Sequence, residues 1–309
     1  MSDGGQWRVE FDADVTFANG GGLQVQGFRL DVPGDRIEDG RLAELLVRHL
    51  GLLMVGDVSI SNKRMLREPH KGGRGVAVAA PGPRRLVELS HVVREGMITY
   101  PGLPGPTISD HLSREASKAM YASGTTFQIG LITICSNTGT YVDTPFHRYE
   151  DGTDLSGFPL SSLADLDGVV VRVTGAAGRA IDRAALLPYD VRGRAVLIHT
   201  DWCRHWGTET YGSSEHPYLT EDAAEWLAEQ GAALVGIDSL NIDHTPQGGT
   251  RPAHTVLLAA GIPIVEHMRG LEQLPPEGFR FHAAPPRVEG MGTFTVRAYA
   301  VVGGEDGAA

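Results

Sequence analysis

The stretch 220–266 constrains the fold more than any other part of the chain. Residues 233–237 form a continuous apolar run, which is typical of a strand buried on both faces of a parallel sheet. The segment before it, 221–230, has the composition of a helix with an acidic first turn, and a second helix is predicted over 252–260. A strand follows over 262–266. The order strand, helix, strand predicts a right-handed crossover in an α/β sheet.

The N-terminal part of the chain has a different pattern, which predicts a small α+β segment. Residues 7–11 and 23–30 alternate apolar and polar side chains, as half-buried strands do. Residues 41–50 carry leucines on one helical face, and 55–61 predict a third strand. We therefore divide the chain into an N-terminal segment at 1–75, a Gly/Pro-rich linker at 76–84, a mixed α/β domain at 85–302 and a tail at 303–309.

Composition excludes several classes of protein. Lys and Arg number 27 against 38 Asp and Glu, giving a net charge of -11, so a nucleic-acid partner is not expected. No apolar stretch approaches the roughly 20 residues that a membrane span needs. Two cysteines cannot build a disulfide framework, and the N-terminus lacks the pattern of a signal peptide. These features predict a cytoplasmic protein that acts on a small molecule.

The most informative motif lies at 137–149, directly after an apolar run at 127–134. A junction between a strand and a loop is where α/β proteins commonly place their functional sites. Asp143 and His147, four residues apart, have the chemistry of a metal ligand and a nearby acid/base group. The alternative is a turn in which Asp143 accepts hydrogen bonds from backbone amides and His147 is a surface residue.

A second group of polar residues lies around the predicted crossover. His254 opens a helix, and Glu266 ends the next strand, where a carboxylate is partly desolvated and needs a partner or a cation. Alternatively, His254 is a cap or core residue and Glu266 pairs with Arg251 or Arg269. A polar loop directly after the buried strand at 233–237 is a good place for side chains that orient such a site. Its members are Asp238, Asn241, Asp243 and His244.

Three further residues are weaker candidates. Trp202 follows the predicted strand at 195–200, and its indole is suited either to a pocket wall or to the core. Cys203 has basic neighbours that lower a thiol pKa, which leaves a nucleophilic thiolate open. Arg148 adjoins His147 and is a candidate for binding substrate.

Together these motifs resemble the cyclase family typified by bacterial kynurenine formamidase. The family signature reads His-x-Gly-Thr-His-x-Asp-x-Pro-x-His. In this chain the matching positions are Asn137, Gly139, Thr140, Tyr141, Asp143, Pro145 and His147. Further matching pieces are 89–91, 100–102, 238–241 and 252–254, with Glu266 twelve residues after His254. The resemblance spans about 85–302.

The resemblance implies a swivelling β/β/α fold that assembles as a homo-oligomer, a dimer or tetramer, with metal near the signature. Carried over by position, Asp143 would bridge two metal positions, and His254 and Glu266 would complete one of them. His147 would be the catalytic acid/base.

Two departures bear on the metal. Asn137 and Tyr141 replace the signature histidines that would build the other metal position, and a neutral amide and a phenol are poor ligands for zinc. A two-metal site is therefore not expected. Asp143, His254 and Glu266 remain, which predicts one Zn²⁺ or Mn²⁺ ion or none.

These residues favour an enzyme that hydrolyses a small amide, formamide or lactone with His147 as acid/base. Asn137, Trp202 and Arg148 are the expected substrate contacts. One alternative is a metal-independent cyclase or dehydratase, in which His147 and Tyr141 move protons while a ring closes on a small aldehyde, imine or keto substrate. A second alternative, from another class, is a non-catalytic binding protein.

Overall fold

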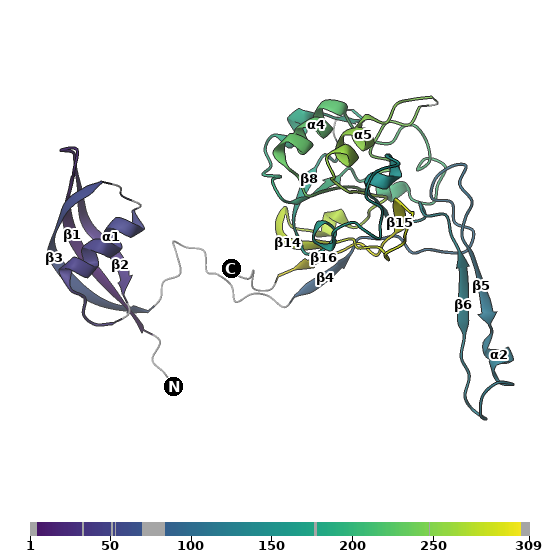
Figure 1. Ribbon diagram of the computed structural model, residues 1–309, viewed down its shortest axis with the longest axis horizontal. Helices are drawn as coiled ribbons and strands as arrows, with labels where there is room; N and C mark the ends of the chain where they lie inside the picture. Colours follow the sequence, from purple (N-terminus) through teal and green to yellow (C-terminus); the bar gives the residue numbers. More distant parts are fainter. Residues whose placement is uncertain are drawn as a thin grey trace. The chain divides into compact units, whose positions relative to one another are not determined.

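A computed structural model shows the chain as two compact units, Met1–Ala80 and Pro81–Ala309 (Figure 1). The structure describes residues 5–32, 34–50, 52, 54–69, 84–175, 178–246 and 248–303. Nearly all of the expected linker at 76–84 and of the tail at 303–309 lies outside these ranges. No helix in the described part of the chain is both long and apolar enough to span a membrane.

The N-terminal unit is a three-stranded antiparallel sheet covered on one face by a helix, as the alternating pattern predicted. Its elements are β1 (Gly5–Phe17), β2 (Gly22–Val32), α1 (Asp39–His49) and β3 (Val55–Pro69), with strand order β2-β1-β3. Leu42 and Leu46 of α1 pack with Phe11 of β1 in its core. On the intervening positions of β1, Glu10 pairs with Arg29 and Arg64. The period-2 alternation thus separates an apolar face from a charged one.

The second unit is built on a nine-stranded mixed sheet, which confirms the predicted α/β class. Its strands in chain order are β4 (Arg85–Glu88), β7 (Tyr141–Asp143), β8 (Leu166–Arg172), β10 (Ala195–His199), β12 (Leu234–Ile237), β13 (Ile264–Glu266), β14 (Glu277–His282), β15 (Thr293–Thr295) and β16 (Tyr299–Val302). The spatial order is β15-β7-β13-β12-β10-β8-β14-β16-β4. The four central strands, β13 to β8, run parallel, and the flanking pairs are antiparallel.

Two apolar clusters lie on either side of this sheet. Val235 and Ile237 of β12 face a cluster that includes α4 (Glu221–Gln230) and α5 (Pro252–Ala259), whereas Leu234 belongs to the cluster on the other face. Figure 1 shows both helices on the same side of the sheet. Burial on both faces explains why β12 is a continuous apolar run.

A hairpin of β5 (Thr107–Leu112) and β6 (Ile129–Thr133) projects from this unit (Figure 1). We call residues 107–133 the arm; it also contains the short helix α2 (Arg114–Ser117). The apolar run that precedes the 137–149 motif is a strand, as predicted, but it lies outside the main sheet. Every residue of β6 is exposed, including Leu131 at 54% and Ile132 at 50%. Apolar character alone therefore did not place this strand in the core.

The smaller elements complete the second unit. They are a two-stranded sheet of β9 (Ala180–Ile181) and β11 (Tyr218–Leu219), the helix α3 (Arg183–Leu186), and 3-10 turns at η1 (Pro145–His147), η2 (Leu160–Ser162), η3 (Trp202–His205) and η4 (Leu271–Gln273).

Candidate active site

Strands β7 and β13 bring the two predicted carboxylates into one site. They pair antiparallel, with Tyr141 opposite Glu266 and Asp143 opposite Ile264. The helix α5 then places His254 against both carboxylates, with its Nε2 atom 3.6 Å from Asp143 Oδ2 and 3.8 Å from Glu266 Oε1. The chain thus gathers, from three elements, side chains that are 123 positions apart in sequence (266 minus 143).

Asp143 is fully buried, yet one of its oxygens is unpaired. Oδ1 accepts a hydrogen bond from Thr293 Oγ1. Oδ2 has no hydrogen-bond partner among the described residues and faces His254. Burial by itself would raise the pKa of Asp143, but the adjacent His147 and His254 and the Thr293 hydroxyl hold that pKa below its usual value. Asp143 is therefore ionised, and a buried anionic oxygen without a donor is a natural ligand for a cation.

Thr293 also contacts His147, which lies in η1 at the mouth of the site. Thr293 Oγ1 is 2.8 Å from His147 Nδ1 while its hydroxyl proton points to Asp143. The threonine oxygen must then accept the Nδ1 proton, which leaves Nε2 of His147 with a free lone pair. The His147 side chain is 36% exposed, so this lone pair is accessible to a small molecule.

His254 is oriented by Asp243, from the polar loop that the sequence singled out. Its Nδ1 atom lies 2.7 Å from Asp243 Oδ2, and the same carboxylate accepts the backbone N–H groups of Ala253 and His254. Burial acts to lower the pKa of His254, but the nearby Asp143 carboxylate, the hydrogen bond to Asp243 and the charge of Glu266 raise it to about 10. This carboxylate–histidine pairing directs Nε2 into the site, as in many metal centres.

Glu266 differs from Asp143 because both of its oxygens are hydrogen-bonded. Oε1 accepts from Ile242 N at 2.6 Å, and Oε2 accepts from Tyr141 Oη at 2.6 Å and Asn241 Nδ2 at 3.2 Å. Burial raises the pKa of Glu266 to about 7, with the charge of Asp143 acting in the same direction. The alternative salt bridge to Arg251 or Arg269 is not formed.

Behind Tyr141 lies a hydrogen-bonded pair that sequence reasoning missed. His267 Nε2 is 3.3 Å from Tyr141 Oη, and His267 Nδ1 is 2.8 Å from Tyr211 Oη. His267 is fully buried, and its backbone has φ 56°. Burial lowers its pKa to about 3, so the ring is neutral and can donate to one phenol while accepting from the other. The only signal in the sequence is its position next to Glu266.

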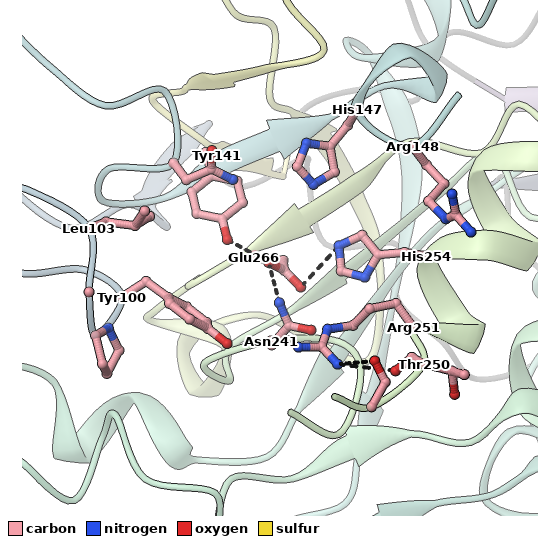
Figure 2. A pocket seen from close by; sticks show the side chains of 14 residues that line it. Tyr100, Leu103, Tyr141, His147, Arg148, Asn241, Thr250, Arg251, His254 and Glu266 are labelled. Carbon is pink, nitrogen blue, oxygen red and sulfur yellow. Dashed lines mark hydrogen bonds and ion pairs between the residues drawn. The ribbon is translucent and has the colours of Figure 1, made fainter. Parts of the chain in front are cut away.

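A cavity of about 660 Å³ lies over this group of side chains (Figure 2). The predicted residues Asn137, Tyr141, His147, Arg148, His254 and Glu266 are all among its lining residues. The lining also includes Tyr100, Pro101, Gly102, Leu103, Asn241, Gly249, Thr250 and Arg251. Asp143 lies beneath them, at the buried end of the group.

Two weaker candidates lie elsewhere. Trp202 is not among the described residues that line the cavity, and its indole N–H donates to the carbonyl of Tyr211 at 3.1 Å. Trp206 of the same loop stacks on His91 instead. Burial, with the charge of Asp238, raises the pKa of Cys203 to about 12, so a thiolate nucleophile is not available there.

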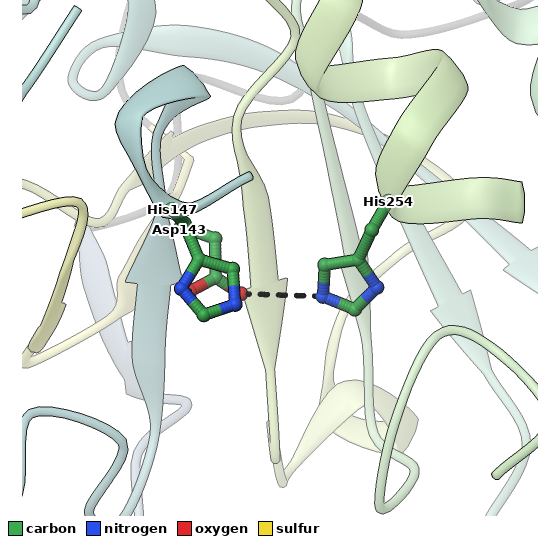
Figure 3. A group of neighbouring side chains, drawn as sticks. All are labelled: Asp143, His147 and His254. Carbon is green, nitrogen blue, oxygen red and sulfur yellow. Dashed lines mark ion pairs between the residues drawn. The ribbon is translucent and has the colours of Figure 1, made fainter. Parts of the chain in front are cut away.

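One group of side chains has the spacing of a metal site. Ligand atoms of Asp143, His147 and His254 all lie within 4.8 Å of one another (Figure 3). This set shares Asp143 and His254 with the predicted ligands and contains His147 in place of Glu266. The Asp143 oxygen without a hydrogen bond and the oriented His254 nitrogen fit a divalent ion, for which either His147 or Glu266 would be the third ligand.

Comparison with known proteins agrees with this architecture. The sequence profile of the Cyclase family matches residues 87–244, about half of the chain, so the chain belongs to the cyclase family. The kynurenine formamidase of Erythrobacter litoralis is 28% identical over 205 residues, which cover 66% of this chain and 88% of the relative. Cyclase-like protein 2 of Oryza sativa subsp. japonica is 27% identical over 239 residues, covering 74% and 82%.

Solved structures share the fold. Isatin hydrolase A from Ralstonia solanacearum superposes with a TM-score of 0.60 at 22% identity, covering 72% of this chain and 93% of the other. A protein described as a potential metal-dependent hydrolase with cyclase activity gives 0.58 at 24% identity, covering 71% and 98%. The swivelling β/β/α prediction is therefore confirmed.

Proposed function

We propose that this chain is a metal-dependent hydrolase that cleaves the carbon–nitrogen bond of a small amide, with formamides, cyclic amides and the related lactones as the substrate classes to test. Relatives named kynurenine formamidase support amide cleavage, and the cavity is of a size suited to a small molecule. The fold by itself would not identify this chemistry, because one fold hosts many reactions.

The observation that carries the proposal is the unpaired, buried Oδ2 atom of Asp143. It faces His254 Nε2 at 3.6 Å and lies next to His147, the most accessible of the three side chains. A core carboxylate with no donor is costly unless a cation or a reacting group approaches it.

Asp143 and His254 would hold the metal, a Zn²⁺ or Mn²⁺ ion, with Glu266 as the third ligand. Once bound, such an ion supplies a Lewis acid for the amide carbonyl and lowers the pKa of water. Asp243 accepts a hydrogen bond from Nδ1–H of His254, so that Nε2 is the nitrogen that would bind the ion.

His147 is the acid/base of the proposed reaction. Thr293 fixes the Nδ1 proton, so Nε2 is free to take a proton from the attacking water and return it to the leaving nitrogen. In this assignment His147 does not bind the metal, whereas in the Asp143–His147–His254 group it would be a ligand.

Tyr141 is a hydrogen-bond donor rather than a base in this scheme. Burial, together with the charges of Glu266 and Asp143, raises its pKa well above the usual 10. Its proton is directed to Glu266 Oε2. A ring-closing reaction that uses Tyr141 to accept a proton is therefore disfavoured relative to hydrolysis.

The test is to purify the full-length chain, measure bound Zn and Mn by mass spectrometry, and assay a panel of formamides, cyclic amides and lactones. We expect turnover of at least one class, loss of turnover with a chelator, and recovery on adding Zn²⁺ or Mn²⁺. Turnover that survives both chelation and His147→Ala would overturn the mechanism. Binding without turnover across the panel would favour a non-catalytic role.

We also propose that the chain self-associates through the arm. Five apolar side chains of the arm are about half exposed, which is unusual for a free surface. They are Ile108, Phe127, Ile129, Leu131 and Ile132. Sedimentation of the full-length chain should show a dimer or tetramer that Leu131→Lys weakens. Leu160→Lys, which changes an even more exposed leucine outside the arm, should leave the assembly intact. Unchanged assembly in Leu131→Lys would refute the role of the arm.

A further inference from the structure

Arg251 is a half-buried cation in the catalytic cavity whose charge is not paired within the described part of the chain. It is the N-cap residue of α5, three positions before His254, and it lines the same cavity. Its Nη1 atom donates to the backbone carbonyls of His244, Gly249 and Thr250 at 3.3, 3.4 and 3.1 Å. These contacts hold the guanidinium in place without neutralising it.

The way Arg251 is anchored leaves a specific set of donors. A guanidinium carries five N–H groups in a planar fork, and the three carbonyl contacts all involve Nη1. In the described structure, Nε and Nη2 make no hydrogen bond, and Figure 2 shows the side chain extending toward Asn241. Two parallel N–H groups on one edge of a guanidinium match the two oxygens of a carboxylate.

The neighbouring helix N-terminus does not offer an anion site of its own. The N–H groups of Ala253 and His254 are already bonded to the Asp243 carboxylate, at 2.7 and 3.0 Å. An anion entering the cavity therefore finds its donor in the Arg251 side chain and not in the backbone of α5.

The charges in the cavity indicate what the Arg251 guanidinium could bind. Asp143 and Glu266 place two carboxyl groups at the inner end, and His254 there already faces both of them, so a further free carboxylate is not favoured at that end. Arg251 supplies a positive charge in the same cavity. Arg148 is a second cation of the lining, but it is exposed and its Nε–H points to Thr255 Oγ1 at 3.3 Å. Arg251 is the better pre-organised of the two.

We propose that Arg251 is a specificity-determining residue that binds a carboxylate of the substrate. The substrate class is then an amide or formamide that also carries a carboxylate, with the carboxylate on the Nε/Nη2 edge of Arg251 and the amide near His147. This inference rests on the proposed hydrolase function for the role of the second group, but carboxylate binding can be measured without catalysis.

The first experiment measures binding to the His147→Ala protein by calorimetry, with matched pairs that differ only in a carboxylate or a carboxamide. Suitable pairs are N-formyl-L-phenylalanine with its amide, and benzoate with benzamide. We expect the carboxylate of each pair to bind more tightly than the carboxamide. Arg251→Gln should lower the affinity for the carboxylate about 10- to 100-fold, which is the range of a charge-assisted hydrogen bond. Arg251→Lys should recover part of the loss, since it keeps the charge but not the fork.

Two controls separate the sources of carboxylate binding. Each titration is run on chelator-treated and on Zn²⁺-loaded protein, because a bound metal can itself take a carboxylate. Binding that requires Zn²⁺ and is indifferent to Arg251→Gln would overturn the inference. Arg148→Gln is the matched control and should cost less than Arg251→Gln. No preference for the carboxylate in any pair, including the absence of all binding, would also overturn it.

Kinetics distinguish this inference from the proposed function. If the wild-type chain hydrolyses neutral amides as well as their carboxylate partners, the hydrolase stands and the role of Arg251 fails. If carboxylates bind through Arg251 but no amide is cleaved, the binding site stands and the hydrolase fails. When both hold, Arg251→Gln should raise KM for the carboxylate substrate far more than it lowers kcat.

Discussion

Asp143 and Glu266 are two fully buried carboxylates of one cavity, and they differ in how their oxygens are paired. Glu266 accepts three hydrogen bonds from neutral donors, and burial raises its pKa to about 7. Asp143 has an oxygen, Oδ2, without a hydrogen-bond partner in the described structure, and the nearest charged group to it is His254 at 3.6 Å. Burial would raise its pKa too, but His147 and His254 lower it below the usual value.

This difference in pairing indicates that Asp143, and not Glu266, has an oxygen available to a ligand. The donors around Glu266 are a phenol, an amide and a backbone N–H, which satisfy the group whether or not a metal is present. Asp143 accepts one hydrogen bond, from the Thr293 hydroxyl, and its other neighbours are two imidazoles, which are themselves metal ligands or bases. Asp143 therefore depends on whatever occupies the cavity, whereas Glu266 depends mainly on the fold.

The strongest test of this contrast compares Asp143→Asn with Glu266→Gln. Asp143→Asn removes the charge from the unpaired oxygen, and we expect it to abolish tight metal binding and lower kcat/KM by at least about 10³-fold. Glu266→Gln should cost only about tenfold in metal affinity, because neutral donors surround it. Metal content and steady-state kinetics measure both effects. Equal losses in the two variants would show that the carboxylates are equivalent ligands.

The next test concerns His147, which is either an acid/base or the third ligand. If it is the acid/base, His147→Ala should lower kcat by about 10²-fold while the bound metal stays at the wild-type level. Thr293→Val, which removes the hydroxyl between His147 and Asp143, should have a smaller effect in the same direction. Loss of metal from His147→Ala would instead assign it to the ligand set with Asp143 and His254.

A third prediction is that the metal-free protein loses stability as the pH rises. The pKa of His254 is about 10 in the folded chain, raised from 6.5. A raised pKa stabilises the fold fully below 6.5, and that contribution is lost as the pH rises through about 10. We expect the Tm of chelator-treated protein to fall over this window by several degrees, at about 2–4 °C per kcal/mol. His254→Gln should flatten the profile.

Added Zn²⁺ should change the sign of that dependence. Metal binding needs the neutral imidazole, so stabilisation by the ion grows as the pH rises. A Tm profile that is the same with and without Zn²⁺ would mean that His254 does not bind the ion.

Much of the site could be predicted from the sequence because its residues lie in local patterns. Asp143 and His147 belong to one short motif, and His254 and Glu266 flank a recognisable crossover. The loop with Asn241 and Asp243 also performs the orienting role expected of it. Asn241, Asp243 and Glu266 lie at or after the ends of the parallel strands β12 and β13, which meet at one edge of the sheet, whereas Asp143 reaches this edge from the antiparallel strand β7.

The residues that could not be predicted are those whose role depends on three-dimensional neighbours. His267 and Tyr211 contact each other across 56 positions, and no spacing rule connects them. The sequence suggests Arg251 only as a partner for Glu266, because the carbonyls that hold its side chain become neighbours only when the loop folds. The exposure of the arm could not be predicted either, because an apolar strand looks the same in a sequence whether it is buried or exposed.

The smallest expected effect concerns Tyr141, which replaces a histidine of the family signature. Its hydroxyl donates to Glu266, the carboxylate whose two oxygens are both hydrogen-bonded. Tyr141→Phe removes one of three donors to Glu266 and leaves His267 Nε2 without its phenol acceptor. We expect a loss of stability of about 1–2 kcal/mol and little change in kcat, because the phenol takes no part in proton transfer. Urea unfolding at neutral pH measures the first quantity, and Tyr211→Phe, on the other side of His267, is the matched control. A large fall in kcat at unchanged stability would give Tyr141 a catalytic role. The donor to Glu266 would then also act on the substrate, and Glu266, like Asp143, would depend on what occupies the cavity.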